Sequence, residues 1–194
     1  TGLGEPLVHP EFLEMVTYAR ARLPGCSLIV VTNGILLKRY CRELADAGVD
    51  KISVSLNAGE FGTWAAMNRK GTESQFHGIL EALACLGRMK KSGRPRLTVT
   101  AVLNKHNYDS LRDLLRITRQ SKGEALNFFR MMVMDLGGSA CNREFLCSPE
   151  QFRKFEETLE ETKRDTGGVS VNLCGIGPGD GSLETASVAA TTPC

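Results

Sequence analysis

The chain has 194 residues, of which 42% are hydrophobic and 24% charged, and a formal net charge of +2 at pH 7. This length suits one domain with a sizeable core. The near-neutral balance argues against a nucleic-acid-binding protein, and no apolar run is long enough to span a membrane. We therefore expect partners other than nucleic acid or membrane.

Periodicity predicts strands and helices that alternate along the chain. In chain order the predicted elements are a helix at 10–23 that opens on Pro10, a strand at 28–31, a helix at 37–48 that ends at Gly48, a strand at 52–56, a helix at 76–86, a strand at 97–103, a helix at 111–118, a strand at 125–129, a helix at 148–159 and a strand at 169–173. Strands separated by single helices imply parallel pairing with right-handed crossovers. The predicted fold is therefore α/β, either a (β/α) barrel or an open doubly wound sheet.

The last stretch, residues 175–194, lacks this pattern. It is rich in glycine and small residues and too poor in apolar residues to pack alone, which is typical of a linker. We place a domain boundary near residue 175.

Seven cysteines are scattered along the chain, and no pair has the CxxC spacing of a zinc or redox site. Cys41 and Cys85 fall on stretches with helical apolar periodicity, where a cysteine is usually a small buried hydrophobe. This usage is typical of a reducing compartment without a disulfide framework, so we expect a cytoplasmic protein.

Polar signatures fall where three successive strands end, which is where both candidate architectures bind ligands. The first is residues 2–6, with the sequence Gly-Leu-Gly-Glu-Pro. Glycines let the backbone approach a ligand, Glu5 can accept hydrogen bonds from an ammonium group, and Pro6 fixes the turn. The alternative interpretation is a plain strand–helix turn with a surface carboxylate.

The second signature is Thr32 and Asn33 before Gly34, and the third is Ser55 and Asn57 at the end of the next strand. Ser55 and Asn57 are two residues apart and so share a side of the strand, where they can grip a carboxylate or ribose hydroxyls. Taken singly, each signature is also typical of an ordinary turn or polar strand end.

The order and spacing of the three signatures resemble the S-adenosylmethionine (SAM) site of the radical SAM superfamily, with leucine in place of the first glycine of its GGEP motif. The resemblance covers roughly residues 1–135. It implies a partial (β/α)6 TIM-like barrel, truncated at the first strand. Residues 1–174 would hold strands two to six plus a following helix, and residues 175–194 would lead toward a C-terminal extension.

The resemblance also implies roles for individual residues. Those implied to bind the cofactor are Gly4, Glu5 and Pro6 at the methionine ammonium, Thr32, Ser55 and Arg69 at the methionine carboxylate, Asn33 in the same cradle and Asn57 near the ribose. Family members cleave SAM reductively at a 4Fe–4S cluster to give a 5′-deoxyadenosyl radical, which abstracts hydrogen from the substrate. An electron donor such as flavodoxin or ferredoxin is implied, and the substrate would be a peptide, a protein or a small molecule.

The cluster-binding spacing CxxxCxxC of the family is absent from this sequence, which begins at Thr1. We therefore expect a fragment whose cluster ligands lie upstream and which is inactive alone. Cys194, after the glycine-rich linker, resembles the entry to a SPASM-type extension and is a candidate ligand of an auxiliary 4Fe–4S cluster; such enzymes often modify peptides or proteins. The alternatives are a catalytically inactive radical-SAM-like binding module and a TIM-barrel lyase or epimerase.

Overall fold

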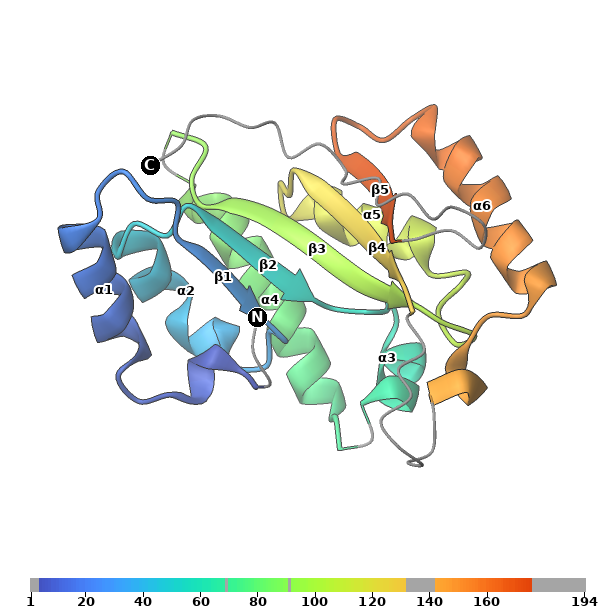
Figure 1. The fold of residues 1–194 in the computed structure, drawn as a ribbon, viewed down its shortest axis with the longest axis horizontal. Coiled ribbons are helices and arrows are strands. Elements are labelled where there is room, and N and C mark those ends of the chain that lie inside the picture. The colour runs from blue at the N-terminus through green and yellow to red at the C-terminus, as the bar shows by residue number, and fades with distance from the viewer. Residues whose placement is uncertain (1–3, 69, 91, 132–141, 176–194) are drawn as a thin grey trace.

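Five parallel strands form one sheet in the computed structural model, which describes residues 4–68, 70–90, 92–131 and 142–175 (Figure 1). The strands follow one another across the sheet in chain order. They are β1 (Ile29–Thr32), β2 (Lys51–Ser55), β3 (Arg96–Leu103), β4 (Ala125–Arg130) and β5 (Ser170–Cys174). Each neighbouring pair is parallel, which confirms the predicted strands and the α/β class.

Helices connect the strands as predicted. The predicted ones are α1 (Phe12–Arg22), α2 (Leu37–Asp46), α4 (Glu73–Met89), α5 (Leu111–Gln120) and α6 (Pro149–Lys163). Three short elements were not predicted, namely α3 (Phe61–Met67) and the 3-10 helices η1 (Pro6–Val8) and η2 (Asn142–Phe145). They are too short for helical periodicity to register in a sequence window. In the described part of the chain, no helix is both long and apolar enough to cross a bilayer.

The first helix begins later than the sequence predicted. Pro10 was expected at its first position, but α1 starts at Phe12. A separate turn precedes the helix, because the N–H of Phe12 donates to the carbonyl of His9 at 3.2 Å and the N–H of Glu11 donates to Nδ1 of His9 at 3.2 Å. Pro10 therefore lies inside this turn.

The two faces of the sheet differ in what covers them. Helices α4 and α5 lie behind the strands in Figure 1, and most residues on that face are apolar and buried. They include Val30, Ile52, Val54, Leu97, Val99, Leu126 and Phe128. The described residues place no helix over the opposite face, where the alternating positions carry serine, threonine, asparagine and partly exposed side chains. We call this second face the open face.

Asp50 ties together the amino-terminal edge of the sheet. The residue is 6% exposed, and its carboxylate pairs with Arg20 of α1 and with Arg94, just before β3. It also accepts a hydrogen bond from the N–H of Leu28 at 2.9 Å. Burial disfavours the charge, but these hydrogen bonds and the two guanidinium groups outweigh it. The pKa of Asp50 is therefore lowered from its ordinary value of 3.8.

Replacement of Asp50 by asparagine should destabilise the protein in a pH-dependent way. A lowered folded pKa means that the stabilisation is present above the unfolded value of 3.8 and is lost as the pH falls through the folded value. We expect Asp50→Asn to reduce the free energy of unfolding by about 1–3 kcal/mol at neutral pH, because charged hydrogen bonds are lost. The deficit should shrink below about pH 4. Urea denaturation across pH measures this, with Glu43→Gln on the exposed side of α2 as control; a deficit that stays constant with pH would contradict the assignment.

Candidate functional site

Glu5 joins the amino-terminal turn to the end of β1. Its carboxylate accepts hydrogen bonds from the Thr32 hydroxyl at 2.6 Å and from the N–H groups of Asn33 at 2.7 Å and Leu7 at 3.2 Å. Pro6 begins η1, because its fixed φ suits the first helical position. The turn that contains Gly4, Glu5 and Pro6 is thus bonded directly to the second sequence signature, although the two are far apart in the chain.

Thr32 is 2% exposed and lies on the helix-covered face. Its hydroxyl donates to Glu5 and accepts a hydrogen bond from the N–H of Gly34 at 3.0 Å. The hydroxyl is therefore engaged within the protein. This arrangement favours a role in positioning Glu5 over the direct contact with a ligand carboxylate that the resemblance implied. The adjacent Asn33 is exposed, and its Oδ1 accepts from the N–H of Ile35 at 3.0 Å.

Gly34 allows the end of β1 to pack tightly against α4. Its φ is +83°, in the left-handed region that side chains disfavour. A Cβ atom there would lie 2.9 Å from a methyl group of Ile79 and 3.0 Å from one of Val54. The Thr-Asn-Gly signature thus needs its glycine for packing as well as for the turn.

The two residues of the third signature, Ser55 and Asn57, have different partners at the end of β2. The Ser55 hydroxyl lies 3.3 Å from the Thr100 hydroxyl of β3. Asn57 lies beyond the strand with a φ of +66°, so strand alternation does not extend to it and the expectation that it shares a side with Ser55 does not follow. Its Oδ1 instead accepts a hydrogen bond from the N–H of Val102 at 2.9 Å, which joins the ends of β2 and β3.

Asn107 braces these same strand ends. It is fully buried, and its amide nitrogen donates to the carbonyls of Asn57 at 2.8 Å and Val102 at 2.9 Å. Its Oδ1 accepts from the N–H of Asn104 at 2.8 Å. The Asn104 side chain is also buried and bonded within the loop, to the carbonyl of Val102 and the N–H of His106. The loop after β3 is therefore held by its own asparagines.

A row of polar side chains crosses the open face, one from each of β2 to β5. Ser55 pairs in register with Thr100, Thr100 with Asn127, and Asn127 with Asn172. The amide nitrogen of Asn172 donates to Oδ1 of Asn127 at 2.8 Å. We call these four residues the polar row. Sequence reasoning missed three of them, yet the signal is present, because polar residues at alternate positions of a predicted parallel strand indicate a face without a helix over it.

Val102 and Phe129 lie one pleat beyond the polar row, toward the carboxyl ends of the strands. They pair in register and are 40% and 43% exposed, so the two form a small exposed apolar surface. The open face therefore offers hydroxyl and amide groups beside an apolar surface, close to the ends of the strands.

These groups fit SAM. A carboxylate and a glycine-containing turn suit its ammonium, hydroxyl and amide groups suit its carboxylate and ribose, and exposed apolar side chains suit a purine. The described ranges contain no group of three or more His, Cys, Asp or Glu side chains that could hold a metal ion, so they supply no ligand set for a 4Fe–4S cluster.

Some of the predicted residues cannot be placed. Arg69, Cys194 and the stretch 176–194 lie outside the described residues.

Arg130, at the end of β4, stacks on the Phe152 ring of α6 with 4.4 Å from Cζ to the ring centroid, and pairs with Glu156 at 3.7 Å.

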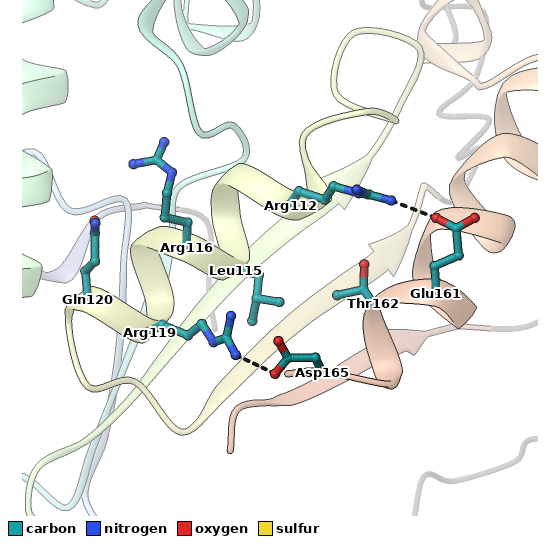
Figure 2. Close-up of a pocket in the computed structure, with 8 residues that line it drawn as sticks. All are labelled: Arg112, Leu115, Arg116, Arg119, Gln120, Glu161, Thr162 and Asp165. Atoms are coloured by element: carbon teal, nitrogen blue, oxygen red, sulfur yellow. Dashed lines mark hydrogen bonds and ion pairs between the residues drawn. The ribbon is translucent and has the colours of Figure 1, made fainter. Parts of the chain in front are cut away.

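A pocket of about 510 Å³ lies between α5 and α6, on the helix-covered side (Figure 2). Arg112 reaches Glu161 at 2.7 Å, and Arg119 reaches Asp165 at 2.8 Å, so two of its guanidinium groups are paired across the helices. The third arginine of the pocket, Arg116, pairs with an acid of its own helix at 3.2 Å. The pocket is therefore a helix–helix junction with paired charges, and the open face remains the candidate site.

A family comparison matches residues 1–117 to the Radical SAM superfamily. The chain belongs to the radical SAM superfamily. The match includes all three strand-end signatures and extends into α5. The superfamily uses SAM together with a 4Fe–4S cluster, and its relatives and structural neighbours are enzymes with a TIM-barrel-like fold, which confirms the predicted fold class.

Similar proteins include GTP 3′,8-cyclase 2 of Mycobacterium tuberculosis, 33% identical over 138 residues that cover 70% of this chain and 36% of the relative. Streptococcus suis SuiB bound to its precursor peptide SuiA superimposes with a TM-score of 0.67 at 13% identity, over 89% of this chain and 37% of SuiB. SuiB bound to SAM gives a TM-score of 0.63 at 14% identity, over 89% and 36%. The chain spans about a third of the length of the curated relatives that it matches.

Loss of the Asn107 side chain should destabilise the site more than loss of an exposed asparagine. Asn107→Ala removes three hydrogen bonds and leaves buried backbone groups unpaired, so we expect the free energy of unfolding to fall by about 2–4 kcal/mol. Asn172→Ala on the exposed end of the polar row is the matched control and should cost less than about 1 kcal/mol. Chemical denaturation of both variants checks this, and equal losses would contradict a bracing role.

Proposed function

We propose that this chain is the SAM-binding core of a radical SAM enzyme. The proposal rests on the hydrogen bonds that Glu5 accepts from Thr32 and Asn33. These bonds bring two family signatures together at the carboxyl end of β1. Ser55 follows on the next strand of the sheet. The family match over residues 1–117 supports assigning these three residues and Ser55 to one ligand.

The methionine end of SAM would lie at the turn. The backbone of Gly4, the remaining acceptor capacity of Glu5 and the turn fixed by Pro6 would hold the ammonium group, with Thr32 as the residue that orients Glu5. Asn33 is exposed beside this turn and would face the methionine carboxylate.

The remaining parts of SAM would extend along the rim of the open face. Ser55 would share the methionine carboxylate with Arg69, and Asn57 would lie near the ribose. Val102 and Phe129 would pack against the purine, because both are large, apolar and partly exposed in adjacent register positions.

SAM bound beside a reduced 4Fe–4S cluster supplies a 5′-deoxyadenosyl radical for hydrogen abstraction. The residues named here bind, orient and shield the cofactor, and none is assigned a proton transfer. We propose that residues 1–174 form the partial barrel, that residues 175–194 form a linker and that Cys194 binds an auxiliary cluster. A flavodoxin or ferredoxin would supply the electron, in a reducing cytoplasmic setting that suits the free thiols of the described residues.

We propose a peptide or protein substrate. The polar row ends in the amide side chains of Asn127 and Asn172, which match the donors and acceptors of a peptide backbone. Among the described strands, β5 pairs on one side only, so its other edge can accept an extended segment. SuiB, which shares the fold, is described bound to a precursor peptide. A purine nucleotide is the second candidate, because a relative 33% identical to this chain is a GTP 3′,8-cyclase.

Ser55→Ala should weaken SAM binding roughly tenfold, the effect of one lost hydrogen bond of about 1.4 kcal/mol. Ser27→Ala, an exposed serine just before β1, is the control and should bind SAM like the parent. Isothermal titration with SAM on protein expressed from the complete coding sequence provides the dissociation constants. Equal affinities of parent and Ser55→Ala would remove Ser55 from the site.

Release of 5′-deoxyadenosine should separate the candidate functions. We expect the reconstituted, reduced protein to release it from SAM, and peptide rather than GTP to stimulate release. Stimulation by GTP alone would instead indicate a nucleotide substrate. SAM binding without any cleavage would indicate an inactive binding module, and absence of SAM binding would contradict the proposed role of this chain.

A further inference from the structure

Two cysteine thiols face each other between α2 and α4, on the helix-covered side of the sheet. Sγ of Cys41 lies 3.2 Å from Sγ of Cys85, although the residues are 44 positions apart in the chain. Cys85 also lies 3.6 Å from the thioether sulfur of Met89. The two sulfurs are thus in direct contact, and a disulfide bond would require them to approach to about 2.05 Å.

The thiols differ in their surroundings. Cys41 is 6% exposed, whereas Cys85 is partly exposed. Burial, together with the hydrogen bond to Cys85, raises the pKa of the Cys41 thiol to about 11. Cys41 is therefore protonated at neutral pH and is a poor first nucleophile, since the thiolate is the reactive form.

A pocket of about 430 Å³ leads from solvent to this pair. Its other lining residues are Lys38, Arg42, Glu81, Ala84 and Arg88. Glu81 pairs with Lys38 at 2.5 Å, which leaves the basic groups in excess at the opening. A positive opening raises the local concentration of anionic reagents.

We propose that Cys41 and Cys85 form a dithiol site that an anionic low-molecular-weight disulfide oxidises to a disulfide bond between α2 and α4. The site is separate from the SAM cradle and does not depend on the proposed function. Glutathione disulfide has the required chemistry and serves as the probe.

The reaction takes place in two exchanges. The Cys85 thiolate attacks one sulfur of the reagent, forming a mixed disulfide and releasing one reduced thiol. The Cys41 thiolate then attacks the Cys85 sulfur and releases the second. The two protein thiols lose two protons and two electrons in total, which reduce one reagent disulfide to two thiols. Contact between the sulfurs favours the second step despite the protonation of Cys41, because intramolecular attack has a high effective concentration.

The disulfide bond would join two helices that also pack beside the carboxyl end of β1. Gly34 packs against Ile79 of α4, and α2 begins three residues after Gly34. Closing a loop between residues 41 and 85 restricts the unfolded chain, so the oxidised protein should melt roughly 5–10 °C higher than the reduced protein.

Peptide mapping under non-reducing conditions tests the proposal. Protein from the complete coding sequence is treated anaerobically with glutathione disulfide, alkylated and digested. We expect a linked Cys41–Cys85 peptide pair, with Cys26 still alkylated. Cys41→Ser should retain glutathione on Cys85, Cys85→Ser should leave Cys41 unmodified, and Cys26→Ser should form the link like the parent.

Two outcomes would overturn the proposal without reference to any variant. One is full alkylation of both thiols in the parent after treatment, and the other is a mixed disulfide on Cys85 that never closes. The role of the basic opening has its own measurement. Glutathione disulfide should react about tenfold faster than an uncharged disulfide such as bis(2-hydroxyethyl) disulfide, and Arg88→Gln should reduce this ratio; equal rates in the parent would overturn the preference for an anionic reagent.

Discussion

Side-chain alternation along parallel strands is the constraint on which this molecule depends. Neighbouring residues on one strand meet opposite environments, as Val54 is buried beneath α4 and Ser55 lies on the open face. A slip of one residue in register would place hydroxyls among the helices and valines on the open face. The apolar packing on one side therefore fixes the positions of the polar groups on the other, and the candidate site inherits its geometry from the core.

Different kinds of interaction stabilise the amino-terminal and the carboxyl-terminal ends of the strands. At the amino-terminal edge, Asp50 gathers two arginines and a backbone N–H in a charged junction. At the carboxyl edge, the neutral amides of Asn104 and Asn107 hold the loop, and the carboxylate of Glu5 is the charged group bonded to the end of β1. The junction of Asp50 with its two arginines thus lies at the opposite end of the strands from the candidate site.

Much of the fold follows from the sequence because its signals are local. The run at 28–31 is apolar throughout, and Ser148 with Pro149 is a strong helix start that the capping box of α6 confirms. The site is less predictable, because residue identity at a strand end does not fix orientation. Thr32 proved to be buried and bonded to Glu5, and Asn57 takes a left-handed conformation that ends the alternation. The contact between Cys41 and Cys85 depends on how two helices are rotated about their axes, which short-range periodicity does not specify.

The asparagine brace after β3 has a consequence for the thermodynamics of ligand binding. Asn107 has its hydrogen bonds before any ligand arrives, and it holds the ends of β2 and β3 together through Asn57 and Val102. A ligand at this rim meets backbone that is already ordered, so little protein conformational entropy is lost on association. The hydrogen bonds of Asn107 therefore need not form anew when a ligand binds beside them. A side chain whose hydrogen bonds exist before binding favours preorganised recognition over adjustment of the loop to each ligand.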